Sequence, residues 1–241
     1  CNTEVLVTAG ATEAIAGALL GLLEPGDEVV LFEPMYDSYQ ACIALAGAAS
    51  VPVLLEPPSY RPNMAALEAA ITERTKILLI NSPHNPTGML LTREEQAHIV
   101  RIAEHHNLII VSDEVYEHLV FDGQRHASIA EIPEARERTV VISSGGKTFN
   151  TTGWKVGWAV GPAHLINGVR SAKQFLTYVN AAPFQPAIAH GLLMPDEYFR
   201  QLAKNLEDRR NQLCEVLSAS GFEFFRPEST YFVTADIRTM Q

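Results

Sequence analysis

TKILLINSPHNPTGMLLTREEQAHIVRIAEHHNLIIVS, residues 75–112, is the segment from which the architecture of the chain can be read most directly. It opens and closes with short aliphatic runs, Thr75–Asn81 and residues 108–112, which are typical of strands buried on both faces of a parallel sheet. Between them, Thr92-Arg93-Glu94-Glu95 has the form of a capping box, so we expect a helix from there to about His106. A strand, a helix and a second strand make a βαβ unit.

The same alternation continues on both sides of this unit. Further strands are expected near residues 4–8, 28–33, 50–55, 139–144 and 157–161, with helices between them. The first helix is expected to start at Thr12, after a Gly-Ala turn. The pattern predicts an α/β fold with a mostly parallel sheet.

The end of the chain has a different organisation. Residues 196–220 predict one long amphipathic helix, followed by short strands at residues 222–225 and 230–235. The charged side of this helix is formed by Lys204, Glu207, Asp208, Arg209 and Arg210. We expect a large domain in residues 1–195, then a linking helix and the incomplete beginning of a small α+β domain in residues 196–241. Because the chain begins with Cys1, we also expect a fragment of a longer protein.

Charge and composition exclude several classes of partner. The formal net charge is −10 and no Lys/Arg cluster is present, which argues against nucleic acid or an anionic membrane surface. The apolar runs are too short to cross a bilayer, and no secretion signal is seen. Cys1, Cys42 and Cys214 are odd in number and widely spaced, so we expect buried thiols rather than disulfides or a zinc site. We therefore expect a cytoplasmic protein with small-molecule partners.

Ser143-Ser144-Gly145-Gly146-Lys147 follows a predicted strand, at the edge where open α/β sheets bind ligands. Small residues let the backbone approach a ligand, and a partly desolvated lysine amine can form a Schiff base with a carbonyl. The pattern is short, and a solvated loop lysine explains it equally well.

Asp113-Glu114-Val115-Tyr116 follows the strand at residues 108–112. A buried Asp113 beside a pyridine nitrogen would keep that nitrogen protonated, and the ring would then accept electrons from a substrate carbanion. Tyr116 could donate a hydrogen bond to a phenolic oxygen of the same ring. Taken alone, an acidic pair after a strand is more often a helix cap or a solvated loop end.

Three further segments end or follow predicted strands. Residues 81–88, NSPHNPTG, contain prolines that fix the direction of the Asn85 amide, although a simple tight turn has the same composition. Gly10-Ala11-Thr12 leads into a helix whose first amides could bind a phosphate, with Ser144 and Lys155 adding a hydroxyl and a cation. Many strand-to-helix turns look alike and bind nothing. Tyr36 could stack on an aromatic cofactor or could simply be a core tyrosine.

These motifs, in this order over residues 4–232, resemble the class I/II aminotransferases that depend on pyridoxal 5′-phosphate (PLP) and have fold type I. The resemblance is greatest to the kynurenine and methionine aminotransferase-like group and to the N-succinyldiaminopimelate aminotransferases. It implies a three-layer α/β/α large domain with a mixed, mostly parallel seven-stranded sheet, and PLP as the cofactor. Val115-Tyr116 is similar to the aminotransferases rather than to the acyl-transferring synthases of this fold, which carry Ala-His there.

The resemblance also implies roles for single residues. It makes Lys147, Asp113 and Tyr116 the catalytic residues: Lys147 forms the internal aldimine, Asp113 pairs with the pyridine nitrogen, and Tyr116 contacts the ring oxygen. Asn85 contacts the same oxygen and the substrate carboxylate. The remaining cofactor-binding positions are the phosphate seat at Gly10, Ala11, Thr12, Ser144 and Lys155, the stacking ring of Tyr36, and the supporting amide of Asn81.

The function implied is ping-pong transfer of an amino group from an L-amino acid to a 2-oxo acid, in a homodimer. A PLP-dependent cysteine-conjugate carbon–sulfur β-lyase is the alternative, since it shares the first steps. A PLP-binding regulator would need a basic helix-turn-helix, which this sequence lacks. Family members also have an N-terminal arm and a carboxylate-binding arginine that lie outside this chain. Arg238 lies too early for that role, so we expect cofactor binding but deficient turnover.

Overall fold

Strand residues alternate between two hydrophobic cores. In strand β2, Val29 and Leu31 join one core, and their neighbours Val30 and Phe32 join the other. The computed structural model, which describes residues 3–238, therefore buries both faces of its main sheet. This explains why the strands read as continuous aliphatic runs rather than as alternating patterns.

The main sheet has seven strands in the order β1-β7-β6-β5-β4-β2-β3. The strands are β1 (Val5–Thr8), β2 (Glu28–Glu33), β3 (Ala49–Leu54), β4 (Thr75–Asn81), β5 (Ile109–Asp113), β6 (Thr139–Ser144) and β7 (Gly157–Val160). β7 runs antiparallel to β1 and β6, and the other pairs are parallel. The predicted α/β class and the mixed, mostly parallel seven-stranded sheet are confirmed.

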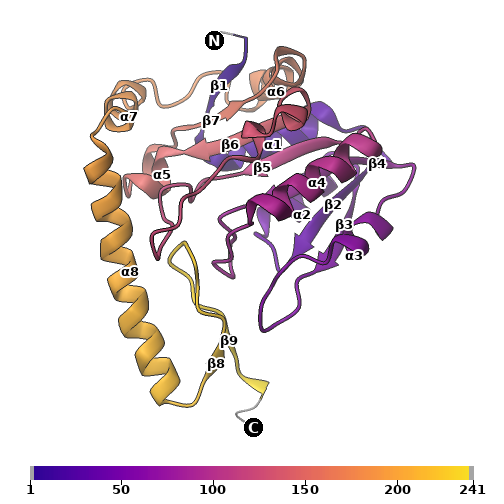
Figure 1. The fold of residues 1–241 in the computed structure, drawn as a ribbon. Coiled ribbons are helices and arrows are strands. Elements are labelled where there is room, and N and C mark those ends of the chain that lie inside the picture. The colour runs from indigo at the N-terminus through magenta and orange to yellow at the C-terminus, as the bar shows by residue number, and fades with distance from the viewer. Residues whose placement is uncertain (1–2, 239–241) are drawn as a thin grey trace.

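Helices cover both faces of this sheet, which gives three layers (Figure 1). One face packs against α1 (Gly10–Leu22), α2 (Ser38–Leu45) and α6 (Ala163–Leu176). The other packs against α3 (Met64–Ala69), α4 (Arg93–His105) and the 3-10 helices η1 (Ile129–Glu131) and η2 (Pro133–Arg138). The remaining short helices are α5 (Gly145–Thr148), η3 (Thr152–Trp154) and α7 (Gln185–Leu192).

The capping box at the start of α4 is present as predicted. The Thr92 hydroxyl accepts from the Glu95 amide at 3.2 Å, and the Glu95 carboxylate accepts from the Thr92 amide at 2.8 Å. Helix α1, in contrast, begins at Gly10, two residues before the predicted start at Thr12. Glu13 explains the difference, because its carboxylate accepts from the Ala9 amide at 2.6 Å and so stabilises an earlier first turn.

Helix α8 (Asp196–Ala219) runs along one side of the molecule, and the chain turns back from its end toward the sheet (Figure 1). The long helix was predicted correctly, but the prediction that Arg210 lies on its charged outer side is wrong. Arg210 is buried, donates to both carboxylate oxygens of Asp122 at 2.6 and 2.7 Å, and lies 4.9 Å from the centre of the Phe121 ring. It therefore attaches α8 to the loop after β5.

The two short strands after α8 are β8 (Glu223–Phe224) and β9 (Ala235–Asp236). The predicted strand at residues 230–235 is wrong, since β9 overlaps it only at Ala235. Thr230 has a φ of +66°, outside the range of a strand. Residues 227–232 instead form a return segment that bonds to the large domain: Glu228 N donates to Gly88 O at 2.9 Å, and Thr230 N donates to Leu119 O at 2.8 Å.

Two other predictions concern cysteines and membrane spans. Cys42 and Cys214 are buried free thiols, as predicted, and Cys1 lies outside the described residues. Within residues 3–238, none of the helices has both the length and the apolar character needed to cross a bilayer.

Candidate active site

A cavity of about 290 Å³ lies at the carboxyl ends of β4, β5 and β6. The residues predicted for the site all line this cavity: Gly10, Ala11, Thr12, Tyr36, Asn81, Asn85, Asp113, Tyr116, Ser144, Lys147 and Lys155. They come together because parallel strands place their carboxyl ends at one edge of the sheet, where open α/β folds bind ligands. Each of the motifs singled out in the sequence therefore contributes to the same cavity.

Lys147 lies on α5, the single helical turn after β6. Its amine is 5.8 Å from the ring centres of both Tyr116 and Tyr231, close enough for cation–π attraction. Gly145 packs closely against Ile188, because a Cβ atom there would lie 2.6 Å from Cδ1 of Ile188 and the Ile188 side chain would have to shift. The turn that carries Lys147 is thus tightly packed, and the amine is half-buried against two aromatic rings rather than extended into solvent.

Asp113 ends β5 and is buried, with 4% of its surface exposed. Its carboxylate accepts from the Tyr39 hydroxyl at 2.7 Å and from the Val115 amide at 3.2 Å. Burial raises the pKa of this carboxyl to about 6, although both hydrogen bonds and the charge of Lys147 oppose the shift. A buried carboxylate of this kind is stabilised in its charged form by a cation that enters the cavity.

Two tyrosine hydroxyls at the cavity stay protonated. Burial raises the pKa of Tyr39 well above its ordinary value, and the negative charge of Asp113 adds to this. Burial also raises the pKa of Tyr116, helped by a hydrogen bond with Tyr231. Both hydroxyls are therefore hydrogen-bond donors over the working pH range.

Asn81 connects two of the loops at the cavity. Its amide nitrogen donates to the carbonyl of Asp113 at 2.9 Å, and its side-chain oxygen accepts from the Asn85 amide at 2.7 Å. Asn81 is buried, whereas Asn85 is half-buried and lines the cavity. The buried amide thus fixes the backbone on which Asn85 is presented.

The opposite end of the cavity is suited to an anion. The N-terminus of α1, at Gly10 to Thr12, opens onto it together with Ser144 and Lys155. The first amides of a helix have no partner within the helix, and the helix dipole favours negative charge there. Lys155 has a left-handed backbone with a φ of +53°, uncommon for a residue with a side chain.

The sequence did not reveal several residues of the cavity. Tyr39, which bonds to Asp113, gives no local signal beyond its spacing of three residues from Tyr36, whose ring it contacts edge-on at 5.6 Å. Phe232 reaches the cavity through the return segment, which no local pattern predicts. The other lining residues that were missed are Ile15, Val115, Gly146, Thr152 and Val156.

Comparison with known proteins agrees with this cavity. The profile of the family described as aminotransferase class I and II matches residues 2–240. The chain therefore belongs to the class I and II aminotransferases, as the order of its motifs predicted. Members of this family use pyridoxal 5′-phosphate.

Among individual relatives, the chain is similar to the probable N-succinyldiaminopimelate aminotransferase DapC of Mycobacterium tuberculosis, with 53% identity over 99% of the chain. It is 39% identical, over 98% of its length, to the methionine aminotransferase of Escherichia coli. The chain spans 61% of the length of each of these two relatives.

Solved structures agree at the level of the fold. The structure of N-succinyldiaminopimelate aminotransferase from Mycobacterium tuberculosis superposes with a TM-score of 0.96 and 53% identity, covering 98% of this chain and 62% of that one. The structure of YbdL from Escherichia coli, described as having a methionine aminotransferase function, superposes with a TM-score of 0.95 and 38% identity, covering 100% of this chain and 63% of that one. Fold type I is thereby confirmed.

The residues present fit pyridoxal phosphate. Its phosphate is an anion, and the cavity offers a helix N-terminus with Lys155 beside it. Its ring nitrogen is basic, and the cavity offers the buried Asp113 carboxylate. Its aldehyde needs an amine, and Lys147 supplies one.

Proposed function

We propose that this chain is the cofactor-binding part of an aminotransferase that moves an amino group from an L-amino acid to a 2-oxo acid in a ping-pong cycle. The observation that carries the proposal is that the Lys147 amine, the Asp113 carboxylate and the N-terminus of α1 face one cavity. Family membership supports the same activity. The aminotransferase names of the relatives given above favour it over the β-lyase alternative.

When bound, the cofactor supplies an electrophilic carbonyl and a ring that accepts electrons from the substrate. We assign the remaining tasks to residues of this chain. Lys147 attaches the cofactor and then carries the proton to and from the substrate α-carbon. Asp113 keeps the ring nitrogen protonated, because a buried carboxylate favours the positively charged form of its neighbour.

The other residues of the cavity bind and orient. Tyr116 and Asn85 donate hydrogen bonds to the ring oxygen, and Asn85 also holds the substrate carboxylate. Tyr36 stacks on the ring. The phosphate is held by Gly10, Ala11, Thr12, Ser144 and Lys155, and Asn81 supports Asn85 from behind.

The amino donor is proposed to be N-succinyl-diaminopimelate or methionine, which the names of the two relatives above suggest, or kynurenine, after the resemblance to the kynurenine aminotransferase-like group. Arg238 is not assigned to the substrate carboxylate. Its side chain is 75% exposed, is paired with Asp236, and lies outside the cavity. A panel of these donors, tested on the full-length protein, will identify the substrate.

Lys147→Ala tests the proposal directly. The full-length protein loaded with cofactor should show a visible absorption band, and the variant should lose both the band and amino-group transfer. Lys76→Ala, at an exposed lysine of β4, is the matched control and should keep both. An unchanged band in Lys147→Ala would refute the role of this lysine.

We further propose a cytoplasmic homodimer with the division into residues 1–195 and 196–241 described above. Support for the dimer comes from large apolar side chains exposed at the end of α6 and directly after it: Phe175 is 86% exposed, Tyr178 73% and Val179 71%. Support for a reducing compartment comes from the free thiols of Cys42 and Cys214. Light scattering should give twice the subunit mass, and Phe175→Asp should shift it toward the monomer.

A further inference from the structure

Two consecutive carboxylates at the end of β5 point to opposite faces of the sheet. Asp113 lines the cavity, whereas the side chain of Glu114 lies behind it and belongs to no wall of the cavity. Strand geometry explains this, because successive side chains alternate between faces. Ser112, two residues before Glu114, points the same way and donates to its carboxylate at 2.8 Å.

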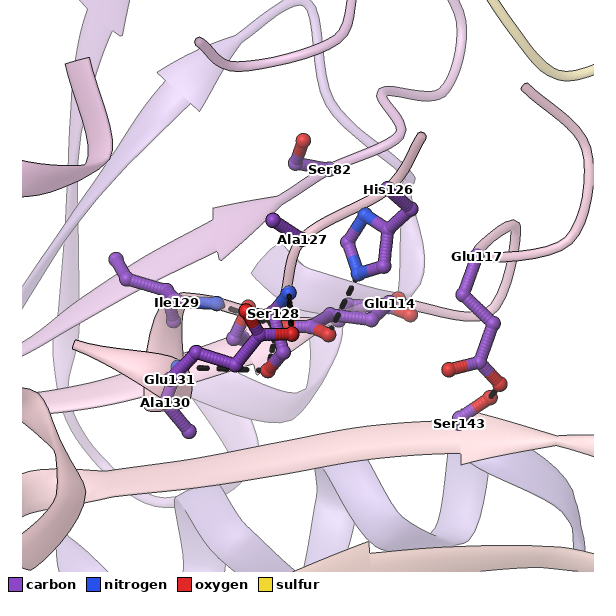
Figure 2. Close-up of polar contacts among 12 residues, drawn as sticks. Ser82, Glu114, Glu117, His126, Ala127, Ser128, Ile129, Ala130, Glu131 and Ser143 are labelled. Atoms are coloured by element: carbon purple, nitrogen blue, oxygen red, sulfur yellow. Dashed lines mark hydrogen bonds and ion pairs between the residues drawn. The ribbon is translucent and has the colours of Figure 1, made fainter. Parts of the chain in front are cut away.

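The Glu114 carboxylate is surrounded by donors from a distant part of the chain. It accepts from His126 Nε2 at 2.8 Å, from the Ser128 hydroxyl at 3.0 Å and from the Ile129 amide at 3.4 Å (Figure 2). Residues 114–128, which include Tyr116, contain no helix or strand. The carboxylate therefore fixes the far end of the loop that follows Asp113 and carries Tyr116, two proposed catalytic residues.

His126 is the basic partner of this carboxylate, bonded to it through Nε2 at 2.8 Å. Among residues 3–238, it is the only basic side chain within ion-pair distance of Glu114, and the two side chains are 8% and 2% exposed. Its other nitrogen, Nδ1, is buried without a hydrogen-bond partner among the described residues. Removing one member of such a buried pair leaves the polar group of the other without its partner, which is costly.

We propose that Glu114 and His126 are positioning residues for Asp113. On the face of the sheet away from the cavity, the hydrogen bond from His126 offsets the negative charge of Glu114, which lies next to Asp113 in the chain. The pair also fixes the turn from which Asp113 and Tyr116 reach the cavity. The kinetic part of this proposal rests on the proposed aminotransferase function. The electrostatic part applies to the cofactor-free protein as well.

The electrostatic part predicts shifts of opposite sign. The negative charge of Glu114 adds to the burial that raises the pKa of Asp113. Glu114→Gln removes a like charge, so Asp113 should ionise at lower pH. His126→Gln disrupts the 2.8 Å hydrogen bond that offsets the negative charge of Glu114, so Asp113 should ionise at higher pH. The titratable groups facing these residues are Tyr39 on α2, Lys147 on α5, and Tyr116, Glu117 and His118 in the loop after β5.

The test follows the Asp113 carboxyl by ¹³C NMR in the cofactor-free, full-length protein. We expect its titration midpoint to fall by about 0.5 pH unit or more in Glu114→Gln and to rise by about as much in His126→Gln. Glu131→Gln is the matched control. Glu131 bonds to the Ser128 amide in the same network, its side chain is 62% exposed, and it does not touch Glu114 (Figure 2). In Glu131→Gln, the titration midpoint of Asp113 should stay at the wild-type value.

Kinetics of the holoenzyme supply the second measurement. In both positioning variants we expect kcat to fall roughly tenfold, with the KM for the amino donor changing less than about threefold, because substrate contacts are untouched. The visible band should remain in both. A purely structural role would lower the melting temperature without moving the Asp113 midpoint or separating kcat from KM.

The results separate the two proposals. Midpoints that do not move, or that move in the same direction in both variants, overturn the positioning role. A wild-type protein without the visible band and without amino-group transfer overturns the proposed function but leaves the NMR result valid. Should Glu114→Gln fail to fold, His126→Gln decides by the sign of its shift. Should both fail, Ser128→Ala decides, because it removes another donor to the Glu114 carboxylate, and an Asp113 midpoint unchanged from wild type then overturns the role.

Discussion

At the scale of single residues, Asp113 is a buried carboxyl whose hydrogen bonds only partly offset the effect of burial on its pKa. Its pKa is raised to about 6 from an ordinary 3.8, even though Tyr39 and Val115 donate hydrogen bonds to it. The folded protein without cofactor therefore holds a carboxylate that would bind a proton more readily than the unfolded chain does. Burial of Asp113 therefore lowers the stability of the cofactor-free protein at neutral pH, as expected for the proposed cation-binding role of this residue.

Asp113→Asn should stabilise the cofactor-free protein at pH 7. Because the folded-state pKa is raised, the stability contributed by Asp113 is full below about pH 4 and is lost as the pH rises through about 6. Since each pKa unit is worth ~1.4 kcal/mol, the gain at pH 7 should be a few kcal/mol at most. Urea unfolding at pH 7 and pH 4 measures it. A variant no more stable than wild type at pH 7 would contradict the prediction.

Tyr39→Phe should raise the pKa of Asp113 further. The Tyr39 hydroxyl donates to the carboxylate at 2.7 Å and lowers its pKa, so its removal disfavours the charged form. The ¹³C titration midpoint of Asp113 in the cofactor-free protein should move upward. Tyr60→Phe, at a tyrosine that packs on Phe225, is the control and should leave the midpoint in place.

The sequence identified residues that sit in recognisable local patterns and missed those that do not. Lys147, Asp113 and Asn85 each follow a strand end within a motif of fixed spacing, so the cavity could be predicted from them. Tyr39 looks like any tyrosine on a helix, and Phe232 reaches the cavity only through tertiary contacts of the return segment. No local propensity encodes such contacts.

At the scale of elements, the anion-binding end of the cavity, at the N-terminus of α1, depends on how closely β7 approaches the start of that helix. A Cβ atom at Gly157 would lie 2.5 Å from the carbonyl carbon of Gly10 and 2.7 Å from the Ala11 amide nitrogen. Both are backbone atoms, which cannot move aside as a side chain can. Only glycine at this position of β7 lets the turn into α1 keep its place.

Gly157→Ala should therefore displace the start of α1. We expect a loss of stability of about 2 kcal/mol or more, and a weakened affinity for inorganic phosphate and for the cofactor. Gly153→Ala is the matched control, since a Cβ atom there meets nothing within 4 Å. Thermal unfolding and isothermal titration measure the two effects, and unchanged affinity in Gly157→Ala would exclude this role.

Element boundaries were predicted well where side chains set them. The capping box correctly predicted the start of α4, and the short aliphatic runs correctly predicted the bounds of β2, β4 and β6. The start of α1 was predicted too late because the effect of Glu13 on the Ala9 amide was not recognised. The strand expected at residues 230–235 failed because the backbone there bonds to distant loops instead of to a neighbouring strand.

At the scale of the whole molecule, Arg210 joins α8 to the large domain. Besides its two bonds to Asp122, its guanidinium donates to the Pro227 carbonyl at 2.8 Å. One side chain therefore connects the long helix, the loop after β5 and the return segment. Residue patterns could not predict this, because a charged residue on an amphipathic helix is ordinarily solvated.

Arg210→Ala should loosen α8 and the return segment together. Amide hydrogen exchange in residues 196–219 and 227–232 should become about tenfold faster or more, while the core strands β4 and β5 stay protected. The neighbouring and exposed Arg209, changed to Ala, is the control and should exchange as wild type does. Faster exchange confined to α8 would show that the return segment is held independently.

The return segment has a consequence for how the protein is made. Phe232 contributes a wall of the cavity whose first residues, Gly10 to Thr12, leave the ribosome more than two hundred residues earlier. A nascent chain that has not yet emerged beyond Phe232 lacks that wall, whatever the state of its sheet. We therefore expect the wall of the coenzyme pocket to be complete only after Phe232 has emerged from the ribosome.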